Sequence, residues 1–307
     1  MKIKASSPCR LSCFGGGTDV DSYAVKYGGL VISMAIDIRQ EFIFDTESSE
    51  RIPAPGGNIN FYDAFLRKFK YTGGFKQNFD GLINAGMGSS AAAAVAMVGA
   101  MSRLNDLRLS KNAIAQKAWE IETIDLDMYG GKQDQYASVF GGFNLIRFGK
   151  NVEVERLDSK LGAWLKENIV LIDTGIRRKD TKIQEGLREL SEEQRKALSL
   201  IKDAAYTSLG AIKRKDLSII AIAMQASWSA KKLSNNVSTP EIDTIYNLGI
   251  NNGALTGKAC GAGGGGYMLF LSPPFKQEKL IKILAQNGYK QRTFDIDYQG
   301  LKVEVIK

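Results

Sequence analysis

Three carboxylates that accompany glycine-rich stretches, Asp19, Glu122 and Asp134, are the residues of this chain best suited to chemistry. The 307 residues include no histidine, which excludes Ser-His-Asp triads, histidine metal ligands and imidazole general bases. Proton transfer near neutral pH must therefore use a carboxylate, a lysine, a tyrosine or a cysteine.

A glycine-serine stretch at residues 86–90 runs directly into an alanine-rich segment with no charged residue before Arg103. A helix that is apolar on all sides is a buried helix. Free N–H groups and the positive dipole end at such a helix start form an anion site, most commonly for phosphate. Serines can equally cap the first turn. This stretch alone therefore predicts either a phosphate cradle or an ordinary capped core helix.

The stretch 261–266 has the G-x-G-x-x-G spacing of a dinucleotide-binding fingerprint. That fingerprint needs a helix after it, and a strand-like segment follows here, so we exclude it. Residues 253–259 are close to a Walker A pattern, but the spacing is one residue short and Ala259 replaces the magnesium-binding Ser or Thr. The stretch 261–266 is then either a flexible loop or a backbone that approaches a ligand phosphate.

A helix is predicted from about Ser110 to about Asp125, with apolar residues at i, i+4 and i+7 on one face. At about 100° per residue, Glu122 flanks that face and Glu120 points nearly opposite. We therefore expect Glu120 in solvent and Glu122 at the edge of a core or cleft.

The other predicted elements alternate little between strand and helix. Their order favours an α+β fold in two lobes over a doubly wound sheet. We place an N-terminal lobe, with a mixed sheet and the buried phosphate-loop helix, at residues 1–160. A C-terminal, α/β sandwich-like lobe is placed at 161–307. The expected elements are paired strands at 30–38 and 41–44, a helix at 59–69, a polar loop at 129–136, a hairpin at 143–157, a strand at 169–173, helices within 181–252 and at 275–286, and an edge strand at 302–306.

Composition is typical of a globular protein, with 44% hydrophobic and 24% charged residues. The net charge of +8 is dispersed, whereas a nucleic-acid binder more often shows a dense basic stripe with aromatic residues. No apolar run approaches the length of a membrane span, and the start is not that of a signal peptide. Three cysteines without zinc-type spacing favour a reduced, cytoplasmic protein.

The chain has three glycine-rich stretches, at residues 15–19, 86–90 and 261–266, and residues 8–10 precede the first of them. In this order they resemble the motifs of the GHMP kinases, the superfamily of galactokinase, homoserine kinase and mevalonate kinase. The resemblance spans about residues 5–271. Within that superfamily the chain looks most similar to the D-glycero-D-manno-heptose 7-phosphate kinases, on residues 14–19, 130–144 and 261–267. Galactokinases carry Glu-His at the positions of Gly16 and Gly17, which argues against that group.

The resemblance implies ATP-dependent phosphorylation of a sugar hydroxyl, the anomeric one of heptose 7-phosphate above all. Asp134 would orient or deprotonate that hydroxyl, and Arg10 would keep Asp134 charged and stabilise transition-state charge. Mg²⁺ would lie on Ser90 (or Ser89) and Glu122. The ATP phosphates would lie on Gly86, Met87, Gly88, Ser89, Ser90 and Ala91.

For the acceptor, the resemblance implies that Asp19 hydrogen-bonds the sugar. A phosphorylated acceptor needs a second cationic anchor, for which Lys132, Arg177 and Arg178 are candidates, although the two arginines fit a solvated surface pair equally well. The other residues assigned to the acceptor are Gly16, Gly17, Thr18, Gly131, Gln133, Thr174, Gly263, Gly264 and Gly265.

Other functions stay open beside this one. They are a kinase for another sugar or sugar acid (galactokinase- or glucuronokinase-like), a mevalonate-branch kinase or decarboxylase, and a non-catalytic sugar or nucleotide sensor. Arg10, Glu122 and Asp134 argue against the sensor, and the turn at 15–19 argues against the decarboxylase. The partner we expect is a small sugar or sugar phosphate, with no nucleic acid or membrane and with a homodimer as an option.

Overall fold

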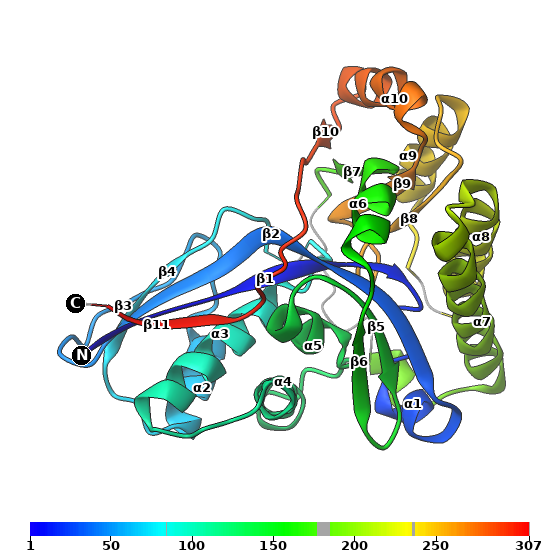
Figure 1. Ribbon diagram of the computed structural model, residues 1–307. Helices are drawn as coiled ribbons and strands as arrows, with labels where there is room; N and C mark the ends of the chain where they lie inside the picture. The colour runs from blue at the N-terminus through cyan, green and yellow to red at the C-terminus, as the bar shows by residue number, and fades with distance from the viewer. Residues whose placement is uncertain (84, 177–184, 235–236, 307) are drawn as a thin grey trace.

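The computed structural model describes residues 1–83, 85–176, 185–234 and 237–306, and it shows two sheets with a shared core between them (Figure 1). Within these ranges the first sheet has seven strands in the order β11-β1-β2-β4-β3, and β5 and β6 continue from β2. Its short β3–β4 pair is parallel, whereas β1 is antiparallel to both neighbours. The sheet is therefore mixed, as predicted. Its strands are β1 (Lys2–Phe14), β2 (Gly29–Asp45), β3 (Arg51–Ile52), β4 (Gly74–Asn78), β5 (Phe143–Phe148), β6 (Val152–Arg156) and β11 (Lys302–Ile306).

The second sheet is antiparallel, in the order β10-β7-β9-β8. It lies with the α6, α9 and α10 helices in the upper right of Figure 1. The α+β class and the two-lobed arrangement predicted from the sequence are confirmed. The elements of this part are β7 (Ile169–Asp173), β8 (Thr256–Ala259), β9 (Tyr267–Leu271), β10 (Lys290–Gln291), α6 (Ser159–Glu167), a 3₁₀ turn (Glu185–Leu187), α7 (Glu192–Arg214), α8 (Leu217–Ser234), α9 (Pro240–Asn251) and α10 (Pro274–Gln286).

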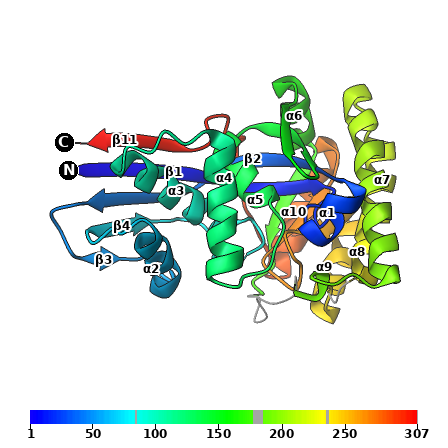
Figure 2. The ribbon, with the colours of Figure 1, turned by 90° about the horizontal axis from the view of Figure 1, so that it is seen from below.

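Strand alternation builds a core on each face of the first sheet. Ile3, Ala5 and Val31 face a helical layer, in which α3 and α5 lie on β1 and α4 covers both (Figure 2). Leu30 and Ile32 face the opposite side, where α7, α8 and the second sheet pack. The helices of the N-terminal part are α1 (Asp21–Tyr27), α2 (Ile59–Lys68), α3 (Ser89–Leu104), α4 (Lys111–Glu120) and α5 (Gln133–Phe140).

The prediction of two paired strands at 30–38 and 41–44 is wrong, because both segments belong to the single 17-residue strand β2. The polar residues between them do not form a turn. Arg39 donates from Nη2 to the carbonyl of Gly300 at 2.7 Å, and Gln40 accepts from Gln77 at 2.7 Å. A register shift between Pro8 and Cys9 of β1 accommodates this stretch, since a bulge bends a strand pair without ending it.

The end of the described chain returns to the first sheet, where β11 pairs with β1 as an edge strand beside the N-terminus (Figure 1). The predictions of an edge strand at 302–306 and of the hairpin at 143–157 are confirmed. No helix in the described ranges has the length and apolarity required to cross a membrane.

Candidate active site

The phosphate-loop helix begins with uncapped amides. Helix α3 starts at Ser89, and its N-cap residue is Gly88 in the left-handed conformation (φ 69°), with no side chain in the described part of the chain capping the first turn. Capping of the first turn by a serine side chain is therefore not found in the described residues, although α3 is the buried core helix that was predicted. Glycine takes this conformation without the strain that a side chain causes, and it leaves the first-turn N–H groups and the positive dipole end available to an anion.

The two later glycine-rich stretches lie back to back. A Cβ added to Gly86 would stand 2.4 Å from the carbonyl oxygen of Cys260, and one added to Gly261 would stand 2.6 Å from the Cα of Gly86. Both glycines also have positive φ. Close backbone packing thus requires glycine at both positions, and the stretch 261–266 supports the loop at 86–90 from the C-terminal part of the chain.

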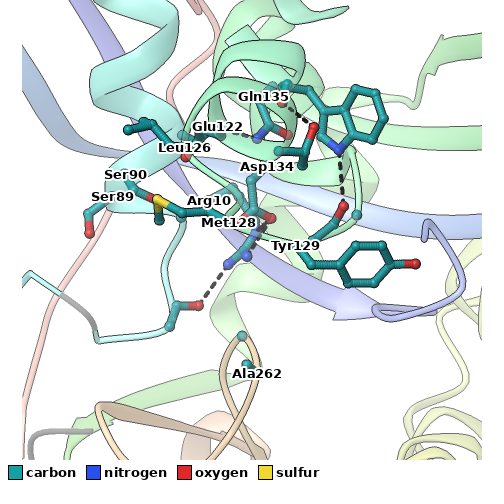
Figure 3. A pocket seen from close by; sticks show the side chains of 18 of the residues that line it. Arg10, Ser89, Ser90, Glu122, Leu126, Met128, Tyr129, Asp134, Gln135 and Ala262 are labelled. Atoms are coloured by element: carbon teal, nitrogen blue, oxygen red, sulfur yellow. Dashed lines mark hydrogen bonds and ion pairs between the residues drawn. The ribbon is translucent and has the colours of Figure 1, made fainter. Parts of the chain in front are cut away.

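Arg10 joins the phosphate loop to Asp134. Its Nε and Nη2 approach Asp134 Oδ1 at 2.6 and 2.5 Å, and its Nη1 donates to the carbonyl of Gly86 at 2.7 Å (Figure 3). The prediction of a polar loop at 129–136 is wrong for its last four residues, because helix α5 already begins at Gln133. Asp134 is thus held in a helical first turn, and an added Cβ on Gly88 would stand only 3.0 Å from its Oδ2.

Glu122 lies in a π-helical segment, Ile121–Asp125, that continues α4. Such segments are rare and are common at functional sites. Glu122 is 5% exposed and accepts a hydrogen bond from Gln135 Nε2 at 2.6 Å. Burial, with the nearby charge of Asp134 adding to it, raises the pKa of Glu122 to about 7, while Gln135 and the hydroxyl of Ser90 lower it. The prediction that Glu122 stands inside is confirmed, whereas Glu120, which was expected in solvent, is only partly exposed and pairs with Lys117.

These groups surround one cavity of about 380 Å³, the large cavity (Figure 3). Its lining includes nine of the residues assigned from the sequence, and it adds residues 126–130, of which Met128 and Tyr129 are labelled in Figure 3. The large cavity therefore combines helix-start amides, a buried carboxylate and an arginine–aspartate pair. The assigned residues in its lining are Arg10, Gly86, Gly88, Ser89, Ser90, Ala91, Glu122, Gly131 and Asp134.

A small cavity shares Arg10 with the large cavity as a lining residue. It also shares Gly261 and Ala262 with the large cavity, and its lining adds Gly16 and Gly17. Asp134 is not among the described residues that line it. A ligand that occupied both cavities would therefore pass Arg10. The remaining lining residues of the small cavity are Ser12, Gln133, Leu187, Lys231 and Lys258.

Comparison with known proteins shows the family of the chain. The family descriptions of the GHMP kinases N terminal domain and the GHMP kinases C terminal domain match residues 59–142 and 208–290. The D-glycero-alpha-D-manno-heptose 7-phosphate kinase of Campylobacter jejuni is 34% identical to the chain, over 98% of both proteins. The chain belongs to the GHMP kinases. It is therefore a phosphotransferase with an alcohol acceptor, and ATP is the phosphate donor of its family.

Solved structures extend the likeness over the whole GHMP kinase fold. A putative sugar kinase from Campylobacter jejuni has a TM-score of 0.78 at 30% identity and covers 99% of this chain and 98% of its own. A protein named D-glycero-D-manno-heptose 1-phosphate kinase from Bacteroides thetaiotaomicron has a TM-score of 0.80 at 23% identity, with 99% of both chains covered. The second likeness concerns the fold alone.

Asp19 of this kinase is buried and binds neighbouring N–H groups, and it is not among the described residues that line either cavity. It is 1% exposed, and its oxygens accept N–H groups from Gly17 at 3.0 Å and from the backbone and side chain of Gln133 at 2.9 Å each. An added Cβ on Gly131 would stand 1.9 Å from Asp19 Oδ2. Burial raises the pKa of Asp19, and the N–H groups of Gln133 and Gly17 oppose that rise. Asp19 thus fixes the turn and orients the amide of Gln133.

Several assigned residues do not belong to the described lining of either cavity and have structural partners instead. The Thr18 hydroxyl bonds the backbone of Gly15 and Leu30, and Lys132 pairs with Asp21 at 2.8 Å while it covers the ring of Trp119. The carbonyl of Met87 accepts a hydrogen bond from the backbone N–H of Arg10, and Thr174 donates to the carbonyl of Gly266. The glycines at 263–265 pack against Val237 or Ile176. Arg177 and Arg178 lie outside the described residues.

Sequence reasoning missed three polar residues of the small cavity, Ser12, Lys231 and Lys258. Lys258 is buried and donates to the carbonyls of Ser12 and Cys13 at 2.7 and 3.1 Å. Lys231 comes from α8 and donates to the carbonyl of Gly261. A lysine in a helix has no local pattern that marks it as facing a site, so the sequence offered no signal for Lys231. Ser12 lies two residues from Arg10, and Lys258 lies in the stretch 253–259 that was rejected as a Walker A loop.

Proposed function

We propose that this kinase transfers the γ-phosphoryl group of ATP to the anomeric hydroxyl of D-glycero-D-manno-heptose 7-phosphate or a closely related sugar. The observation that carries the proposal is the Arg10–Asp134 pair beside the uncapped start of α3. The 34% identity to a protein named as a heptose 7-phosphate kinase supports this acceptor over a mevalonate derivative.

In this proposal Asp134 receives the acceptor hydroxyl. Its Oδ1 is held by two N–H groups of Arg10, which leaves Oδ2, on the Gly88 side, as the oxygen that orients the hydroxyl and takes its proton. Arg10 reaches the loop carbonyl of Gly86 at the same time. It is therefore positioned to stabilise negative charge between the attacking oxygen and the transferred phosphoryl group.

The ATP phosphates would be bound by backbone N–H groups of the 86–91 segment at the start of α3, with Ser89 and Ser90 beside them. Mg²⁺ would be held by Glu122 and Ser90, and when bound it neutralises phosphate charge. The donor set fits this ion, because a buried carboxylate, a hydroxyl and the unpartnered amide oxygen of Gln135 meet there. The described residues contain no cluster of three potential metal-ligating side chains, in keeping with an ion that shares its ligands with phosphate and water.

For the acceptor, we propose that Gly16, Gly17 and Gln133 contact the sugar and that Asp19 acts by orienting Gln133. Gly16 must lack a side chain, since a Cβ there would stand 2.5 Å from Ser12 Oγ. The same reasoning extends to the organisation of the protein. We propose lobes at 1–160 and 161–307, with β11 added to the first, a cytoplasmic setting that fits three buried free cysteines, and a homodimer that light scattering would test.

The proposed function is tested by measuring ATP consumption with a panel of sugars and sugar phosphates. We expect turnover of heptose 7-phosphate, and ³¹P NMR should show a product phosphorylated at the anomeric carbon. Asp134→Ala should lower kcat by about 10³-fold while nucleotide affinity changes little. Absence of turnover on every heptose and hexose phosphate would refute the acceptor, and unchanged kcat in the variant would refute the role of Asp134.

A further inference from the structure

Two polar atoms in the lining of the small cavity have no hydrogen-bond partner among the described residues. They are Oγ of Ser12 and Oε1 of Gln133, in residues that are 6% and 8% exposed. Buried polar atoms are almost always paired, because an unpaired atom has lost its hydration without a replacement. The small cavity therefore offers unused hydrogen-bonding capacity to a ligand.

The two oxygens flank one point beside Gly16. A Cβ added to Gly16 would stand 2.5 Å from Ser12 Oγ and 3.5 Å from Gln133 Oε1, and the nearest heavy atoms around it would be these two and Gln133 Nε2. A ligand oxygen that lies between Ser12 Oγ and Gln133 Oε1 can reach both within hydrogen-bonding distance. One group can therefore satisfy the two unpaired atoms together.

Both oxygens are held in place by the surrounding chain. Ser12 lies at an irregularity of β1, where the register with β2 shifts between Ser12 and Phe14, and bulges beside active sites commonly redirect a side chain. Lys258 donates to the carbonyl of Ser12 at 2.7 Å and fixes this stretch. Gln133 Nε2 donates to Asp19 at 2.9 Å, which directs Oε1 away from that carboxylate. Such preorganisation lowers the cost of binding a ligand.

The chemistry of the ligand follows from what the two oxygens require. Gln133 Oε1 is only an acceptor and needs a donor, whereas the Ser12 hydroxyl can donate or accept. A hydroxyl group supplies both functions, but an ionised carboxylate or a fully ionised phosphate has no hydrogen to donate. The cations of the lining already donate to carbonyl or carboxylate oxygens of the chain. The unmet requirement of the small cavity is therefore for a hydroxyl.

The size of the small cavity leads to the same group. Its volume is about 30 Å³, which is close to the volume of one water molecule in the liquid, about 30 Å³. A single hydroxyl fits this space, and a phosphate group with its several heavy atoms does not. The rest of such a ligand would lie in the large cavity, which shares Arg10, Gly261 and Ala262 with the small one.

We propose that the small cavity selects acceptors by a single sugar hydroxyl, which donates to Gln133 Oε1 and accepts from the hydroxyl of Ser12. The inference rests on the proposed function and deepens it, because it makes Ser12 a specificity-determining residue and places the phosphate of a phosphorylated acceptor outside the small cavity. Gln133 directly precedes Asp134 in α5. The hydroxyl bound here and the one received by Asp134 can therefore belong to one sugar ring.

The test removes the ligand hydroxyl and the protein hydroxyl separately. Steady-state kinetics are measured with heptose 7-phosphate and with its deoxy analogues, each lacking one hydroxyl other than the anomeric one. In the wild type one analogue should lose about 100-fold or more in kcat/KM, because a buried acceptor is left unpaired. Ser12→Ala should lower kcat/KM for the parent acceptor by about five- to tenfold at nearly unchanged kcat.

The decisive readout is how the two losses combine. Ser12→Ala should reduce the penalty of that one analogue by about the same five- to tenfold, and the penalties of the other analogues should stay as in the wild type. A merely structural role of Ser12 would lower kcat/KM for all acceptors alike. That result, or penalties that are the same in the wild type and in Ser12→Ala, would overturn the inference.

A matched control is Ser33→Ala. Ser33 is fully buried and pairs in register with Ser12 on the neighbouring strand β2, but it is not among the described residues that line either cavity. The control should leave the constants for all acceptors unchanged. In thermal melts without ligand, Ser12→Ala should be at least as stable as the wild type, because it removes an unpaired buried hydroxyl. A clear loss of stability would make Ser12 a structural residue and overturn the inference.

A binding measurement separates this inference from the proposed function. The ATP site is saturated with Mg²⁺ and a non-hydrolysable ATP analogue, and D-mannose and its deoxy analogues are titrated by calorimetry. In the wild type the loss of one hydroxyl should raise Kd at least about tenfold, and by a several-fold smaller factor in Ser12→Ala. That result without turnover of any heptose phosphate would keep the inference and refute the function. Turnover of heptose 7-phosphate with penalties independent of Ser12 would do the reverse, and a protein that neither binds nor turns over any sugar would refute both.

Discussion

Replacement of Glu122 by glutamine should stabilise the protein and inactivate it. In the unfolded chain this carboxyl ionises near its ordinary pKa of 4.5, whereas burial raises its folded pKa to about 7. Between these values the folded state holds the proton that the unfolded state has lost, so stability falls as the pH rises, and the penalty is complete above about pH 7. At roughly 1.4 kcal/mol per pH unit, the upper limit of the penalty at pH 8 is about 3 kcal/mol.

Glu122→Gln removes this penalty and keeps an acceptor for Gln135 Nε2. Without metal or nucleotide, we expect its free energy of unfolding at pH 8 to exceed that of the wild type by about 1–3 kcal/mol. The melting temperature should rise by about 3 °C or more. The gain should shrink as the pH falls and disappear below about pH 4.5, where the carboxyl of the wild type is protonated in both the folded and the unfolded state. Thermal melts followed by circular dichroism at pH 5 and pH 8, with EDTA present, measure the difference.

The same substitution should lower kcat/KM for ATP by about 100-fold or more, because it removes the proposed carboxylate ligand of Mg²⁺. Glu120→Gln, two residues away, is the matched control. It breaks only the partly exposed pair with Lys117 at 3.2 Å, so its effect on stability should stay within about 0.5 kcal/mol and its activity should be normal. A Glu122→Gln protein that is less stable than the wild type at pH 8, or that gains equally at both pH values, would refute the reasoning.

Three further outcomes follow from the same geometry. Gly131→Ala should cost about 2–4 kcal/mol in denaturant unfolding, since the added Cβ meets Asp19 at 1.9 Å, whereas Gly149→Ala, whose nearest neighbour is 3.8 Å away, should be nearly neutral. Arg10→Lys should lower kcat by about 10–100-fold, because a lysine cannot bind Asp134 and the loop carbonyl in the same fork, and a normal kcat would contradict this. The thiols of Cys9 and Cys13, whose pKa burial raises to about 12, should resist Ellman's reagent at pH 8 until urea is added.

Local chemistry explains why much of the fold and of the large cavity could be predicted. The uninterrupted apolar run after Ser90 predicted a buried helix, and all residues from Ala91 to Ser102 are buried. The 3.6-residue period likewise separated Glu122 from Glu120. Such predictions succeed because helix periodicity and glycine conformation are properties of a few neighbouring residues.

Predictions that depended on where a segment ends were less successful. Polar residues in the middle of β2 resembled a turn, but their side chains find partners on β1, β4 and the C-terminal segment. The start of α5 at Gln133 was taken for a loop, although its first-turn N–H is bound by Asp19, more than a hundred residues earlier. In both cases a distant partner satisfies the polar groups that otherwise indicate a loop.

The sequence by itself determined the glycine-led start of α3 and the inward placement of Glu122, since each depends on residues close together in the chain, and it determined the family through the order of its motifs. Tertiary structure alone decided which cations line the small cavity. It paired Lys132 with Asp21 and brought Lys231, from a helix more than two hundred residues after Arg10, to the small cavity. The physical reason is that a lysine's role depends on what shares its desolvated surroundings, and those surroundings exist only after β1, β8 and α8 have packed together.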